Sequence, residues 1–114
     1  MLTIDKLKEF GANTDEGLMR CMNNAAFYLK FVNAAASDKK MELLEQQLSD
    51  KDYDAAFETA HALKGMFANL SLDPITKPVS EITDLLRSKT AADCSVLMEE
   101  AKNRFSELRM LTSE

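Results

Sequence analysis

The chain has 114 residues, 46% of them hydrophobic and 29% charged, which indicates one globular domain over residues 1–114. Its net charge of −5 and pI near 4.9 argue against a nucleic-acid partner, because nucleic acids bind basic surfaces. No apolar run could span a bilayer, no polybasic cluster suits a membrane surface and the N-terminus lacks a signal-peptide core, so we expect a cytoplasmic protein.

Apolar residues recur at helical spacing along the whole chain, and three Gly and two Pro leave little material for hairpins. In chain order, Asn13 with Glu16 three residues later predicts the capped start of a short helix. The next helical segment, residues 24–36, places Tyr28, Phe31 and Val32 on a core face, with Phe27 turned away from it. Helical spacing continues through residues 37–48 and 49–72.

A break is expected after Leu72, because Pro74 and Pro78 do not both suit the inside of one regular helix. Helical spacing resumes over residues 79–86 and 94–112, with a turn at residues 88–93. The predicted fold class is all-α: an antiparallel four-helix bundle with one or two short N-terminal helices. Because the chain can close a bundle alone, we expect a monomer.

His61 is the only histidine, and its phase on the helix decides where it points. At about 100° per residue, the apolar stripe falls on the opposite side of the helix. The side of His61 carries mainly polar or small residues, with Phe57 and Leu72 as the exceptions, so the imidazole is predicted to face solvent. The stripe consists of Ala56, Thr59, Leu63, Met66 and Leu70, with Ala60 and Phe67 beside it; the His61 side consists of Asp54, Phe57, Glu58, Lys64, Gly65, Ala68 and Leu72.

Gly65 follows His61 by one helical turn, where a side chain would lean back over the imidazole. Glycine inside a helix costs about 1 kcal/mol relative to alanine, and an exposed face offers no packing reason to accept that cost. Lys64 leans back in the same way and can bring its ammonium group to an anion held at His61. Gly65 therefore predicts access, and Lys64 predicts charge stabilisation.

The chemistry that fits these residues is the uptake of a phosphoryl group. Imidazole is largely neutral at pH 7 and nucleophilic without a separate base, and phosphoryl transfer mainly needs positioning and charge neutralisation. The chain has no glycine-rich phosphate loop and no acidic group of residues suited to Mg²⁺. The phosphoryl donor, and any metal, must then come from another protein.

The segment "AHALKG" followed by "ANL" resembles the signature of the histidine-containing phosphotransfer (HPt) domain family, and the likeness extends over most of the chain. The resemblance implies a four-helix bundle in which His61 is phosphorylated on Nε2, receives the group from a receiver-domain aspartate and passes it to another. It assigns phosphoryl stabilisation to Lys64, access to Gly65 and an open face to Ala68. The pattern departs at Ser71, where the family has glycine.

The resemblance also implies the partners: response-regulator receiver domains, a hybrid histidine kinase, or both. The protein would have no kinase activity of its own and no cofactor, any Mg²⁺ being supplied by the receiver. Contact with the partner is expected at Phe57, Glu58, Ala68 and Leu72.

Three alternatives remain open at this point. The bundle could serve only as a docking module that binds a receiver or kinase without being phosphorylated. His61 could be phosphorylated directly by an ATP-dependent kinase. A haem or metal site formed by His61 and a methionine would need an inward-facing histidine, which the phase disfavours. Cys21 and Cys94 are read as reduced, structural thiols, since they lack a C-x-x-C spacing.

Overall fold

The structure is a computed structural model that describes residues 1–88 and 94–113. These residues form helices joined by short turns, and none of them lies in a strand. The turn expected at residues 88–93 falls almost entirely outside the described residues. The helices are α1 (Ile4–Phe10), α2 (Thr14–Arg20), α3 (Ala25–Ala36), α4 (Lys40–Ser49), α5 (Tyr53–Asn69), α6 (Asp73–Arg87) and α7 (Ser95–Ser113). The all-α prediction and the two short N-terminal helices are confirmed.

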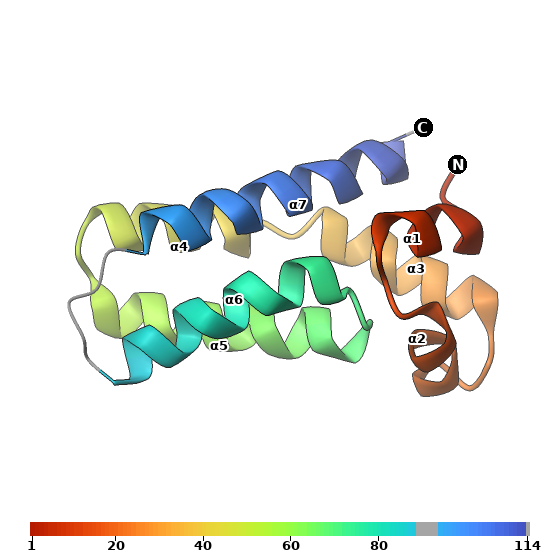
Figure 1. Cartoon of the computed structure of the whole chain (residues 1–114), viewed down its shortest axis with the longest axis horizontal. Coiled ribbons are helices and arrows are strands. Elements are labelled where there is room, and N and C mark those ends of the chain that lie inside the picture. Colours follow the sequence, from red (N-terminus) through yellow and green to blue (C-terminus); the bar gives the residue numbers. More distant parts are fainter. Residues whose placement is uncertain (89–93, 114) are drawn as a thin grey trace.

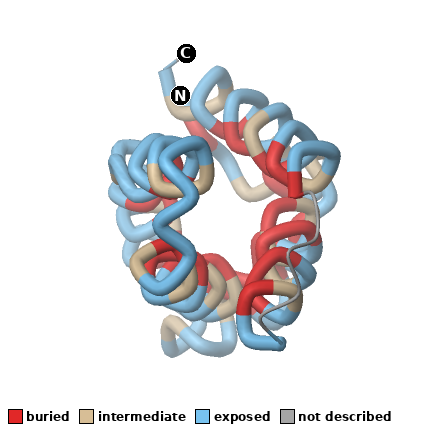
Figure 2. The backbone as a smooth tube through the Cα atoms, turned by 90° about the vertical axis from the view of Figure 1, so that its left-hand side faces the viewer, coloured by how far each residue is buried: buried red, intermediate tan, exposed pale blue. Residues whose placement is uncertain are grey.

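Helices α1 and α3 to α7 contribute buried side chains to one hydrophobic core. α5 packs most extensively against α6, α6 against α7 and α4 against α5, while ion pairs from Lys102 to Glu45 and from Arg109 to Glu42 join α7 to α4. Buried residues line the inner side of this arrangement (Figure 2). α3 and α1 also contact α7, whose last turns lie at the end of the molecule that carries α1 (Figure 1).

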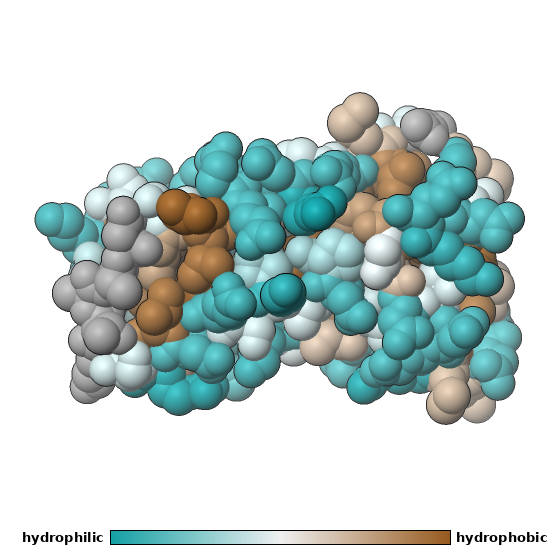
Figure 3. Space-filling view, viewed as in Figure 1, coloured by the Kyte–Doolittle hydropathy of each residue, from teal (hydrophilic) through white to brown (hydrophobic). Residues whose placement is uncertain are grey.

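The face of the molecule drawn in Figure 3 is predominantly hydrophilic. On the face shown in Figure 3, apolar side chains form separate small groups between charged and polar ones. None of the described helices is long and apolar enough to cross a membrane.

Several helices begin at a polar side chain that accepts a hydrogen bond from a backbone N–H left without a partner within the helix. Asn13 caps α2 by accepting a hydrogen bond from the N–H of Glu16 at 3.2 Å, as predicted. The side chains of Thr3, Asn24 and Asp52 cap α1, α3 and α5 in the same way.

The chain does break between two helices near Leu72, but the expected reason is wrong, because Pro74 and Pro78 both lie within α6. Pro74 occupies the first turn, where its missing N–H would have had no partner in the helix. Pro78 is buried one turn later and removes a single hydrogen bond, to the carbonyl of Pro74, while the helix continues to Arg87. The chain reverses earlier, in the turn at residues 70–72.

The N-terminal helices hold this turn in place. The hydroxyl of Tyr28 on α3 donates a hydrogen bond to the carbonyl of Leu70 at 2.7 Å, and the N–H of Asn13 donates one to the carbonyl of Ser71 at 3.0 Å. Burial raises the pKa of Tyr28 to about 12, so the hydroxyl keeps its proton. Because folding raises this pKa, the associated stabilisation is complete below the ordinary value of 10.0 and is lost as the pH rises through about 12.

Ser71 is strained in the turn, and Ser71→Gly is expected to stabilise the protein by about 1–4 kcal/mol. Its backbone is left-handed, with φ of 54°, a conformation that costs a non-glycine residue about 1–2 kcal/mol. Its buried hydroxyl also has no hydrogen-bond partner among the described residues, which adds a cost of about 1–3 kcal/mol. The greater freedom of glycine in the unfolded chain offsets about 0.4–1 kcal/mol of this gain.

Urea unfolding of the two proteins measures the difference. Ser71→Ala is the matched control, since it removes the hydroxyl but keeps the backbone cost, and it should therefore gain less than Ser71→Gly. Equal stability of wild type and Ser71→Gly would show that the left-handed turn carries no measurable strain.

Candidate functional site

His61 lies near the middle of α5 and is exposed, as its helical phase predicts. The opposite side of α5 packs into the core, where Met66 is only half-buried. The described buried residues of this helix are Ala56, Thr59, Ala60, Leu63 and Phe67, followed by Leu70 in the turn. The same periodicity that builds the core therefore turns the imidazole outward.

Gly65 leaves the surface beside His61 open. A Cβ atom placed on Gly65 would meet no other atom within 4 Å, so nothing inside the protein requires glycine there. The backbone of Gly65 is also ordinary right-handed helix, since Gly11 is the one glycine of the chain with positive φ. Neither packing nor backbone conformation within the described residues therefore accounts for glycine at this position.

Lys64 lies next to Gly65 and is half-buried. It makes no ion pair within the described part of the chain, whereas Lys40 and Lys102 are both paired with acidic residues. No acidic side chain of the described residues therefore neutralises its ammonium group. The three residues predicted for the reaction, His61, Lys64 and Gly65, lie within five consecutive positions of α5.

Phe57 lies one turn before His61, and the two rings stack. Their centroids are 5.9 Å apart and their planes differ by 18°. From the last turn of α6, the guanidinium carbon of Arg87 lies 5.7 Å from the centre of the Phe57 ring. The helical phase predicts the correct side of the helix for Phe57, but neither contact was predicted. The four-residue spacing of Phe57 and His61 could have shown the first, while no local signal announces Arg87.

The residues expected to contact a partner are only partly exposed. Glu58 is exposed, and Phe57 and Ala68 are half-buried on the outer side of α5. Leu72 is a correction, because its side chain is fully buried. The helical phase holds only to the end of α5 at Asn69. The left-handed backbone of Ser71 then turns Leu72 into the core, directly before α6 begins at Asp73.

Phe31 is a second correction. Tyr28 and Val32 are buried as expected, but Phe31 is 49% exposed and stacks on Phe27, which is 50% exposed, with their centroids 6.4 Å apart. Among the described helices, α3 has its main contacts with α7 and α2, which cover Tyr28 and Val32 but leave Phe31 half exposed. Phe31 lines a surface hollow of about 600 Å³ together with Met66 and Asn69 of α5.

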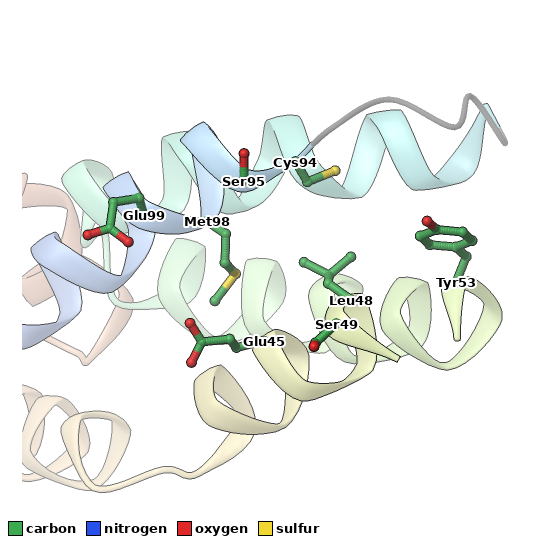
Figure 4. A pocket seen from close by; sticks show the side chains of 8 residues that line it. All are labelled: Glu45, Leu48, Ser49, Tyr53, Cys94, Ser95, Met98 and Glu99. Atoms are coloured by element: carbon green, nitrogen blue, oxygen red, sulfur yellow. The ribbon is translucent and has the colours of Figure 1, made fainter. Parts of the chain in front are cut away.

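Another hollow, of about 330 Å³, lies between α4, the start of α5 and the start of α7 (Figure 4). Glu45, Leu48 and Ser49 of α4 and Tyr53 of α5 face Cys94, Met98 and Glu99 across it, and no residue of the His61 site lines it. Neither cysteine forms a disulfide. No group of three His, Cys, Asp or Glu residues within residues 1–88 and 94–113 could hold a metal ion.

Comparison with known protein families matches residues 34–111 to the Hpt domain. The matched region begins in the last turn of α3 and contains His61, Lys64 and Gly65, while α1 and α2 precede it. No curated protein and no solved structure matches the chain. Because the match covers more than half of its residues, the chain belongs to the Hpt domain family, whose members serve histidine phosphotransfer in phosphorelays.

Proposed function

We propose that this chain is a phosphorelay protein that carries a phosphoryl group on His61 between receiver-domain aspartates. The observation that carries the proposal is the open surface at Gly65, one turn after an exposed imidazole on a helix whose opposite side is core. Membership of the Hpt domain family supports the same reaction. We further infer that α4 to α7 are the family's antiparallel four-helix bundle, formed by a monomer.

The proposed transfer exchanges one phosphorus bond for another. Nε2 of neutral His61 attacks the phosphorus of an aspartyl phosphate, the new N–P bond forms, and the O–P bond breaks with its electron pair left on the receiver carboxylate. The positive charge gained by the imidazole ring is relieved when Nδ1 releases its proton to solvent. Lys64 neutralises part of the charge on the phosphoryl oxygens during transfer.

The receiver would supply any Mg²⁺, because the chain itself is proposed to need no cofactor. Docking would centre on the outer side of α5, with Phe57, Glu58 and Ala68 around His61. The exposed Phe27 and Phe31 pair lies on α3, where Phe31 lines a hollow with Met66 and Asn69 of α5, and it would offer further apolar contact area. We propose no nucleic-acid or membrane partner, and a cytoplasmic location.

Transfer of ³²P from phosphorylated receiver domains tests the proposal, with His61→Gln beside the wild type. We expect label on the wild type alone, lost in acid and retained in base, as a phosphohistidine requires. His61→Gln keeps a polar side chain on an exposed helix position, so its fold and its binding to receivers should be unchanged.

Each other outcome points to a defined alternative. Binding of a receiver by both proteins without any label would make the chain a docking module. Label that appears only with ATP and a histidine kinase would place the kinase, rather than a receiver, as the donor. Label that persists in His61→Gln would assign the phosphoryl group to a different residue and overturn the proposal.

A further inference from the structure

The ring of Phe57 contacts two ionisable side chains from different helices. On α5 it stacks on His61, with centroids 5.9 Å apart. From α6, the guanidinium carbon of Arg87 lies 5.7 Å from the centre of the same ring, close enough for an aromatic face to attract a cation. Phe57 thus links His61 to a positive charge that lies 26 positions later in the chain.

The stack gives the imidazole one covered side and one open side. Side chains on a helix lean toward its N-terminus, so His61 leans over Phe57, one turn earlier. One turn later, Gly65 leaves open space. The near-parallel contact with Phe57 restricts rotation of the imidazole and so fixes the direction in which its reactive nitrogen points.

Arg87 is held only weakly in its present position. Its ionic partner is Asp84, three residues earlier on α6, at 3.3 Å, and the two side chains are 54% and 62% exposed. Exposed ion pairs of this kind contribute little to stability. A phosphoryl group carries more charge than a carboxylate and accepts paired hydrogen bonds from a guanidinium, so it competes well for Arg87.

We propose that Phe57 positions His61 for phosphoryl transfer and also holds Arg87 nearby as a second cation. When His61 is phosphorylated, the guanidinium of Arg87 breaks its ion pair with Asp84 and binds the phosphoryl group. The inference rests on the proposed function of His61. Lys64 approaches the phosphoryl group from the next turn of α5, and Arg87 approaches it from the end of α6. The transferred charge is then shared by two helices, and no bond changes other than those of the phosphorus.

Phosphorylation by phosphoramidate tests this without any partner protein. In this reaction the P–N bond of the donor breaks, ammonia leaves, and the phosphoryl group joins His61. We expect Arg87→Gln to slow labelling about two- to fivefold, as the loss of one partly exposed charge should. Phe57→Leu should slow it at least as much, and Phe57→Tyr, which keeps the aromatic ring, should restore the wild-type rate.

Arg104→Gln is the matched control, because Arg104 forms a similar exposed ion pair with Glu107, three residues away at 3.2 Å, on α7. It should label at the wild-type rate. Thermal unfolding of every variant shows whether the fold is kept. In the phosphorylated proteins, ³¹P NMR measures the titration midpoint of the phosphoryl group. If the guanidinium of Arg87 contacts this group, the midpoint should move upward in Arg87→Gln. A purely structural role of Arg87 would leave the midpoint unchanged.

The double variant tests the role of the ring itself. If Phe57 holds Arg87 in place, Arg87→Gln should have almost no further effect in the Phe57→Leu background. Equal effects of Arg87→Gln in both backgrounds would overturn the link through Phe57, and wild-type rates in both single variants would overturn the whole inference. Failure of the wild type to label on His61 would instead refute the proposed function.

Discussion

Gly65→Gln is expected to reduce phosphoryl transfer from a receiver by about a hundredfold, the size of effect that a small misplacement of reacting groups produces. The new side chain would lean back over His61, where a Cβ atom now meets nothing within 4 Å, and would occupy the space through which the phosphoryl group arrives. The folded protein should lose nothing by the change. Gln, like Ala, is a better helix former than Gly, so Gly65→Gln should be more stable than the wild type by up to about 1 kcal/mol.

Gly65→Gln is thus expected to slow phosphoryl transfer while it stabilises the fold, a combination that damage to the fold would not produce. Gly65→Ala should stabilise as much or more while slowing transfer less, because it adds a single carbon atom. Ala62→Gln adds the same side chain at another exposed position of α5 and is the control for a general effect of bulk on this helix. Transfer rates with a phosphorylated receiver, together with urea unfolding, check both parts. Wild-type transfer by Gly65→Gln would remove access as the reason for this glycine.

The sequence predicted the arrangement of α5 well because a single helix obeys a single periodicity. The positions of His61, Lys64 and Gly65 relative to the core depend only on the angle between successive residues, and tertiary packing then confirms one side as buried. Leu72 shows where this reasoning ends. One left-handed residue, Ser71, changes the direction of the chain, and every residue after it leaves the predicted phase.

Features that depend on two helices could not be predicted in the same way. Arg87 reaches Phe57 because α6 runs back along α5, and the exposure of Phe31 follows from how little of α3 is covered. Pro78 was misjudged for a related reason. The lost hydrogen bond is a local cost, whereas the burial that favours a continuous α6 comes from α5 and α7.

Gly17→Ala is expected to destabilise the protein by about 2–3 kcal/mol. Gly17 is buried in α2 against Tyr28, and an added Cβ would lie 2.5 Å from the hydroxyl oxygen and 2.7 Å from a ring carbon of Tyr28. The ring cannot move aside without lengthening its hydrogen bond to the carbonyl of Leu70. Overpacking costs about 1–3 kcal/mol and the lost hydrogen bond about 1 kcal/mol, against a helix-propensity gain of up to about 1 kcal/mol.

A double-mutant cycle separates the clash from any other effect of Gly17→Ala on α2. In a Tyr28→Leu background the atoms that would clash are gone, so the same substitution should become neutral or stabilising, a reversal that only direct contact explains. Urea unfolding of the four proteins gives the coupling free energy. If Gly17→Ala destabilises equally in both backgrounds, Tyr28 is not the cause. If the coupling is present, α2 and Tyr28 act together on the turn at residues 70–72, which fixes the end of the helix that carries His61.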